Sequence, residues 1–271
     1  MIPVLHLFPT LNSSLMELLE GLSPAQWNSS TVCRKWSVKD ITAHLLDTAL
    51  RRVSSGRDGH FLKSVHGNSY DDLLNSLNTL NAEWVGAYKR VSSQILIKQI
   101  SAAQDDLCEY LKTLNLTAPA LFPVLWVGED KSQIWFDIAR EYIERWHHQQ
   151  QIRLAVGADS ILERELYYPV LEISMLALPH HYRLKPAAEG TVIKINVVGD
   201  AGGSWAILRS KEEWKFTNPE MDADTEVYID QNIAWMLLSK GIDILESEQY
   251  WQVIGDNDLG FHALKLTAFM V

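Results

Sequence analysis

The sequence is short of the features that mark several classes of protein. It contains only two cysteines, Cys33 and Cys108, among 271 residues. They form no C-x-x-C pair of the metal-binding or redox type, so a disulfide between them and two free thiols in a reducing cytoplasm both stay open. No stretch reaches the roughly 18 apolar residues that a membrane span needs. No basic segment precedes the apolar stretches of the first twenty residues, so we expect a cytoplasmic protein without a signal peptide.

Positive charge is also scarce. The chain has 24 Lys and Arg against 34 Asp and Glu, which gives a formal net charge of -10. Because affinity for nucleic acid comes mainly from basic side chains that meet phosphates, we expect no nucleic-acid partner. Hydrophobic residues make up 47% of the chain and charged residues 21%, a composition typical of a globular protein. The length fits one large domain or two ordinary ones.

The first 158 residues have the apolar periodicity of helices. One helix start is unusually clear, since Ser37 is followed three residues later by Asp40 in a capping-box pattern. A connection with two prolines covers residues 115–132. The helices that we expect cover residues 9–22, 38–53, 70–94, 99–114 and 133–156. We therefore predict an N-terminal helical bundle over residues 1–158.

The character of the chain changes beyond residue 158. After a helix expected over residues 161–184, the stretches "GTVIKINVVGD", "GGSWAILRS", "EEWKFTN" and "TEVYID" have the alternation of strands. The stretches "QNIAWMLLSKG" and "NDLGFHALKLTAFM", with a short piece near 246–251, are then expected to be helical. Strands followed by helices predict an α+β domain over residues 159–271, and α+β as the fold class of the chain.

The helix expected over residues 133–156 carries a polar strip about 80° wide between two apolar flanks. The strip contains Asp137, Glu141, Glu144, His148, Gln151 and Ala155. A helix that is apolar on two sides is expected to be buried on both, so the strip faces inward. Buried carboxylates need partners, and a metal ion is one such partner.

Glu144 and His148 are four residues apart, so both side chains can reach one ion. His44, in mid-helix at the edge of an apolar face, is the best third ligand, because antiparallel packing could bring it opposite the pair. These donors suit zinc, nickel, iron or manganese, and three protein ligands leave an open coordination position. Two plainer readings stay open: a solvent-exposed Glu–His pair, and a half-buried His44 with ordinary hydrogen bonds. Glu141, one turn before Glu144, is either a residue that supports the ligands or a solvated carboxylate.

Two stretches around these residues resemble a known family. "WSVKDITAHLLD" and "REYIERWHHQQQIRLAVG" are similar to motifs of the DinB-like metalloprotein superfamily, and within it to the maleylpyruvate isomerase-like, mycothiol-dependent branch. "DTEVYIDQNIAWMLLSKG" and "WQVIGDNDLGFHALKLTAFMV" resemble the C-terminal α+β domain of that branch, which is similar to sterol-carrier proteins. The resemblance implies an up-down four-helix bundle in which His44, Glu144 and His148 hold one divalent metal ion, commonly zinc.

The resemblance also implies an activity. A low-molecular-weight thiol would bind the metal, lose its proton and attack a small electrophilic substrate, which gives an isomerase or a thiol transferase. Members often have an aspartate where this chain has Gln151, a position beside the ligands. The resemblance also implies an arginine of the C-terminal domain near the substrate, as in the family's isomerase, and Arg209 is the candidate here. A metal-dependent hydrolase with water as nucleophile and a non-catalytic binder of a small apolar ligand stay open as alternatives. A monomer and a homodimer are both compatible with the sequence.

Overall fold

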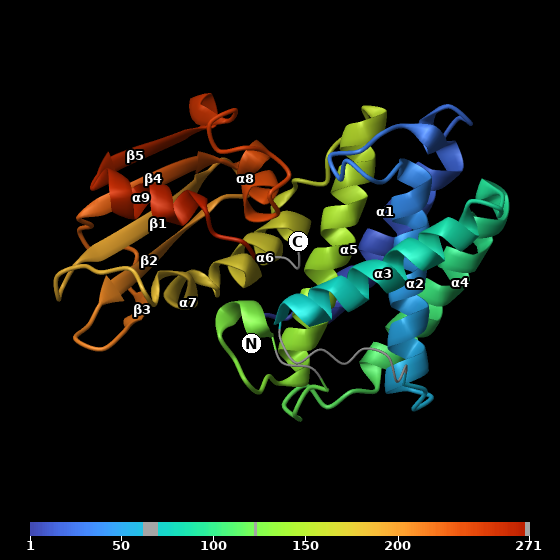
Figure 1. Cartoon of the computed structure of the whole chain (residues 1–271), viewed down its shortest axis with the longest axis horizontal. Coiled ribbons are helices and arrows are strands. Elements are labelled where there is room, and N and C mark those ends of the chain that lie inside the picture. The colour runs from blue at the N-terminus through green and yellow to red at the C-terminus, as the bar shows by residue number, and fades with distance from the viewer. Residues whose placement is uncertain (62–69, 122–123, 269–271) are drawn as a thin grey trace. The chain divides into compact units, whose positions relative to one another are not determined.

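The computed structural model describes residues 1–61, 70–121 and 124–268 (Figure 1). The chain forms two compact units. The helical unit contains Val4–Asn115 and Arg145–Ser160, and the sheet unit contains Met1–Pro3, Leu116–Glu144 and Ile161–Val271. The division falls inside one long helix, between Glu144 and Arg145. A helix of the length and apolarity needed to cross a membrane is absent from the described part of the chain.

The helical unit is built on four helices and half of a fifth. They are α1 (Phe8–Gly21), α2 (Val38–Gly56), α3 (Tyr70–Tyr88), α4 (Ser93–Lys112) and the C-terminal half of α5 (Ile134–Val156), with the short 3-10 helices η1 (Leu5–Leu7) and η2 (Gln26–Asn28). Helix α2 packs against α3 and α4, and α1 packs against α4. Both cysteines belong to this unit and are free thiols.

The capping box predicted for α2 is present. The Ser37 hydroxyl accepts a hydrogen bond from the backbone N–H of Asp40, and the Asp40 carboxylate accepts one from the backbone N–H of Ser37. The limits of the next two helices differ from the prediction. α3 ends at Tyr88 rather than near 94, and α4 begins at Ser93 rather than near 99. The cause is local, because the Ser92 side chain accepts from the N–H of Ile95 and so acts as the N-cap of α4.

Helix α5 is buried on all sides from Arg145 to Ile152. Every side chain from Arg145 to Ile152 is buried, including those of three consecutive glutamines. The helix ends as predicted at Gly157, which has a φ of +67° that favours glycine. The N–H of Ala158 donates to the carbonyl of Arg153 and closes the last turn. Leu154 lies on one of the two apolar flanks that the sequence predicts to be buried, but it is 47% exposed.

The sheet unit confirms the α+β class. Its mixed sheet has the order β3-β2-β1-β4-β5, with β1 parallel to β4 and the other neighbours antiparallel. The strands are β1 (Val192–Val198), β2 (Gly203–Arg209), β3 (Trp214–Thr217), β4 (Thr225–Asp230) and β5 (Trp251–Gly255); the helices are α6 (Arg164–Met175), α7 (Leu178–Tyr182), α8 (Gln231–Leu238) and α9 (Asn257–Leu264), with η3 (Leu125–Val127) and η4 (Glu248–Tyr250). Helices α8 and α9 both contact β1 and β4.

One expectation about this unit was wrong, and one strand was not expected. The helix expected over residues 161–184 is two helices: α6 ends at Met175, and α7 begins at Leu178 with Pro179 in its first turn, where a proline is favoured because its missing N–H needs no partner. The short helical piece expected near 246–251 is the single turn η4, and the edge strand β5 follows it directly. β5 has five residues and pairs with β4 alone, so its sequence carries little alternation to reveal it.

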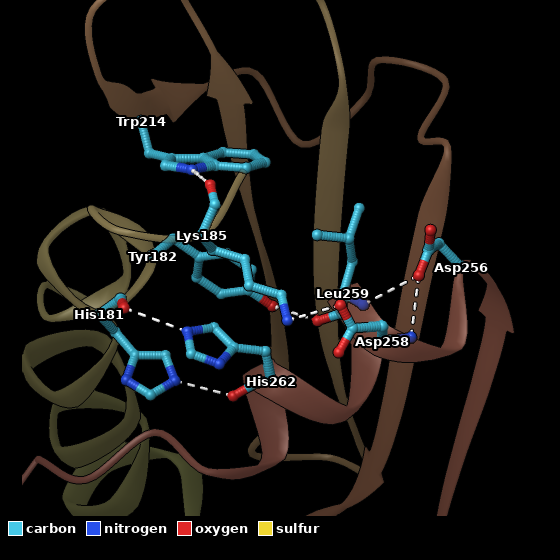
Figure 2. A network of polar contacts seen from close by, with 8 residues as sticks. All are labelled: His181, Tyr182, Lys185, Trp214, Asp256, Asp258, Leu259 and His262. Atoms are coloured by element: carbon cyan, nitrogen blue, oxygen red, sulfur yellow. Dashed lines mark hydrogen bonds and ion pairs between the residues drawn. The ribbon is translucent and has the colours of Figure 1, made fainter. Parts of the chain in front are cut away.

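Helices α7 and α9 are joined by a reciprocal pair of hydrogen bonds, which Figure 2 shows together with neighbouring contacts. His181 Nε2 lies 2.7 Å from the carbonyl oxygen of His262, and His262 Nε2 lies 3.1 Å from that of His181. The two rings stack with their centroids 4.2 Å apart. The Tyr182 hydroxyl donates to the carbonyl of Leu259 at 2.7 Å, which adds a third bond between the same helices.

Candidate metal-binding site

The structure brings together the two histidines that the sequence singled out. His44 lies on α2 and His148 on α5, and both are buried, at 8% and 9% exposure. Their ring centroids are 4.9 Å apart and the rings stand nearly perpendicular, at 82°. Two helices separated by about a hundred residues of chain thus present two imidazoles to each other inside the helical unit.

Glu144 lies one turn before His148 on the same helix, at the spacing that lets both side chains meet one ion. Burial raises the pKa of its carboxyl to about 7; Arg140 lowers that pKa and Glu141 raises it further. Among the residues that the structure describes, no three His, Cys, Asp or Glu side chains converge closely enough to hold a metal ion. The participation of Glu144 as a third ligand therefore stays a prediction.

Gln151 orients the ring of His148. Its side-chain oxygen lies 2.9 Å from Nδ1 of His148, and its side-chain nitrogen lies 2.7 Å from Nε2 of His147. With the amide in this orientation, Nδ1 of His148 carries the proton and donates, and Nε2 keeps its lone pair. That is the tautomer in which Nε2 binds metals, with the opposite N–H held by a neighbouring acceptor.

His44 has the complementary property. Its Nδ1 atom is buried and has no hydrogen-bond partner in the described structure. Burial holds the pKa of His44 well below its usual range, and the nearby His148, Arg51 and Arg145 lower it further. Burial also lowers the pKa of His148 to about 4. A lowered pKa favours the neutral form of both rings, which is the protonation state that a metal ligand requires. In the tautomer of His44 with an unprotonated Nδ1, that atom would offer its lone pair to a cation.

Two aromatic residues near this pair were not assigned to the site from the sequence. The Trp36 ring centroid lies 4.8 Å from that of His44 and 6.3 Å from that of His148. His147 is buried beside His148, with ring centroids 5.4 Å apart. The sequence could have indicated the role of His147. Gln151 lies four residues after His147 and three after His148, so its side chain can reach both rings. Nothing local signals the contact of Trp36.

The remaining predicted residues lie elsewhere. Glu141 is half-buried on α5, one turn before Glu144. Arg209 ends β2, and its guanidinium carbon lies 6.0 Å from the ring centroid of Trp214. One guanidinium nitrogen of Arg209, Nη1, is buried without a hydrogen-bond partner in the described structure. An unsatisfied donor of this kind suits an anionic group.

A cavity bears on the alternative of an apolar ligand in the sheet unit. Apolar side chains of α6, α8, α9 and the sheet enclose a space of about 10 Å³. Pockets that hold small molecules usually measure about 300–1,000 Å³. This cavity is a packing defect of the core rather than a tunnel for an apolar ligand.

Comparisons with known proteins identify the family. A sequence model described as the mycothiol maleylpyruvate isomerase N-terminal domain matches residues 8–153, which is more than half of the 271-residue chain. The chain belongs to this family. The match places it in the DinB-like superfamily, as its motifs predicted, and the matched range contains His44, Glu144 and His148. Arg209 lies outside the matched range.

Two solved structures have a fold similar to that of this chain over most of its length. A mutant of mycothiol-dependent maleylpyruvate isomerase aligns at a TM-score of 0.56 and 10% identity, covering 92% of this chain and 90% of that chain. A second crystal structure of mycothiol-dependent maleylpyruvate isomerase aligns at a TM-score of 0.53 and 12% identity, covering 86% of each chain. At these identities the likeness establishes the fold. No curated protein sequence matches the chain.

Proposed function

We propose that this chain is a metal-dependent enzyme that uses a low-molecular-weight thiol to isomerise, or to transfer the thiol to, a small electrophilic substrate. The observation that carries the proposal is the pair of buried imidazoles of His44 and His148, whose ring centroids lie 4.9 Å apart. Membership of the mycothiol maleylpyruvate isomerase N-terminal domain family supports the thiol part, as does the fold shared with mycothiol-dependent maleylpyruvate isomerase.

The donor set fits a divalent cation. His44 offers a buried nitrogen without a partner, and Gln151 fixes His148 in the tautomer that leaves Nε2 as donor. Glu144 is the proposed third ligand, since it lies one turn from His148 and its carboxylate would balance part of the charge. Two imidazoles and one carboxylate suit zinc first, then nickel, iron or manganese. When bound, such a cation would favour thiolate over thiol and so supply a nucleophile at neutral pH.

Other residues would act on the substrate and the ligands. Gln151 would hold the His148 ring in place, and Glu141 would help to set the charge beside Glu144. We assign Arg209 to binding an anionic group of the substrate, because its Nη1 atom is a buried donor without an acceptor in the described structure.

The first test is the metal content of the purified protein. We expect about one equivalent of zinc or another divalent metal in the wild type, and a loss of most of it in His44→Ala and His148→Ala. His60→Ala is the matched control, because His60 is an exposed histidine in the same unit and should leave the metal content unchanged. Full metal content in His44→Ala would remove that residue from the site.

The second test addresses the thiol. Cobalt-substituted protein should change its visible absorption spectrum when a binding thiol is added, because a sulfur ligand alters the electronic transitions of the ion. Mycothiol, glutathione and cysteine should be compared at equal concentration. A spectrum unchanged by every thiol, in a protein that holds cobalt, would rule out the thiol part. Thiol-independent turnover of esters or amides would then support the hydrolase alternative.

A further inference from the structure

The most informative feature outside the assigned residues is Trp36, which packs against both candidate ligands. Its ring is tilted by 45° to that of His44 and by 40° to that of His148, at centroid distances of 4.8 and 6.3 Å. The two imidazoles meet edge-on at 4.9 Å. The three rings therefore form one cluster, in which the indole is the member that cannot titrate and touches both of the others.

Hydrogen bonds hold the main chain at Trp36 in place. The N–H of Trp36 donates to the carbonyl of Cys33 at 2.8 Å, and the carbonyl of Trp36 accepts from the Thr31 hydroxyl at 2.8 Å and from the Thr31 N–H at 3.3 Å. The next residue, Ser37, is the N-cap of α2, held by the capping box with Asp40. Trp36 is thus anchored on both sides, and the helix that it precedes is the one that carries His44.

The burial of the three rings differs. His44 and His148 are buried, whereas Trp36 is half-buried and keeps part of its surface in solvent. Large aromatic side chains supply many van der Waals contacts at a small entropic cost, because they have only two rotatable bonds. An indole packed against an imidazole limits the rotation of that ring, and for His44 no hydrogen bond of Nδ1 in the described structure does so.

We propose that Trp36 is a positioning residue of the metal site, which holds the imidazoles of His44 and His148 in the arrangement that binds one ion. The proposal rests on the proposed function, since it requires that the two histidines bind a metal. Gln151, on the same helix as His148, orients that ring by a hydrogen bond. Trp36 would orient the rings of both His44 and His148 by packing against them.

The test compares variants of Trp36 in metal-free protein by equilibrium dialysis against Co²⁺. Loss of a residue that orients ligands costs about tenfold to a hundredfold in metal affinity, so Trp36→Ala should weaken binding by that factor. Trp36→Phe keeps an aromatic ring and should restore most of the affinity. Trp135→Phe is the control: this tryptophan stacks on Phe136, about 20 Å before His148 along α5, and its loss should not change the dissociation constant.

Fluorescence gives a second readout that does not depend on the folding of Trp36→Ala. Bound Co²⁺ quenches a nearby indole, so its addition should quench the wild type and Trp135→Phe equally and Trp36→Phe clearly less. Equal quenching in Trp36→Phe, or a Trp36→Ala variant that binds Co²⁺ as tightly as the wild type, would overturn the role of Trp36. A wild-type protein that binds no Co²⁺ would instead overturn the proposed function.

Discussion

The side chains around His148 show how a neutral group can set the tautomer of a buried histidine. An amide has one accepting and one donating end, and Gln151 uses them on two different imidazoles, those of His148 and His147. A carboxylate in the same place would accept from His148 equally well but would add a negative charge to the site. The amide therefore sets the tautomer without changing the net charge, and a cation bound there would keep more of its positive charge.

Replacement of Gln151 tests this arrangement. In Gln151→Leu the Nδ1 atom of His148 loses its acceptor, so we expect metal affinity to fall by about tenfold to a hundredfold. Gln104→Leu is a matched control, because Gln104 is also a buried glutamine of the helical unit but lines a groove with Asn12 and Cys108. Dialysis against Zn²⁺ measures both variants. Equal affinities in the two variants would show that Gln151 does not orient a ligand.

At the scale of a single helix, α2 depends on its capping box. Removal of an N-cap hydroxyl costs about 1 kcal/mol, so Ser37→Ala should lower the free energy of unfolding of the helical unit by about that amount. Ser37→Thr should keep most of the stability, because threonine also caps helices. Urea unfolding followed by circular dichroism measures the difference. An unchanged free energy in Ser37→Ala would show that the cap is not a stabilising element.

The contact between α7 and α9 predicts a dependence on pH. Burial lowers the pKa of His181 to about 4 from its usual 6.5, and burial also lowers the pKa of His262. The charged or titratable groups near this stacked pair are His180, Arg183, Lys185, Asp258 and Lys265. Most of these groups are basic, and each ring of the pair lies beside another histidine. The positively charged form of His181 or His262 is therefore unfavourable in the folded protein.

The sign of the effect follows from proton binding. Between pH 6.5 and about 4 the unfolded chain binds more protons at His181 than the folded chain, so the stability from this contact is full above pH 6.5 and is lost as the pH falls toward 4. In His181→Gln the unfolding free energy should fall less steeply over this window. His60→Gln, at an exposed position, should keep the wild-type slope. Urea titrations at several pH values measure the slopes, and equal slopes in His181→Gln and wild type would contradict the prediction.

For the molecule as a whole, the proposed metal site would link metal binding to the stability of the fold. A ligand that binds the folded state alone, at a free concentration one hundred times its dissociation constant, raises the free energy of unfolding by about 2.7 kcal/mol. We expect a stabilisation of that order when zinc is added to the chelator-treated wild type, and none in His44→Ala. Stabilisation of both proteins by zinc would place the binding elsewhere.

The α+β class and most of the elements were predictable, because amphipathic periodicity and helix caps are local signals. The errors have local explanations too: Ser92 and Pro179 divide stretches whose apolar periodicity is continuous, and β5 is too short to show alternation. The boundary between a bundle at 1–158 and a domain at 159–271 stays a prediction. In the structure the compact units cut across it, since residues 116–144 belong with the sheet.

The sequence by itself determined what depends on positions a few residues apart. The capping box of α2, the inward polar strip of α5 and the one-turn spacing of Glu144 and His148 all follow from helix geometry, which is the same wherever a helix lies. The tertiary structure alone decided that His44 faces His148 and that Trp36 packs on both. The contacts with His148 join segments about a hundred residues apart, and they depend on how the side chains of several helices fill one interior, which no local pattern encodes.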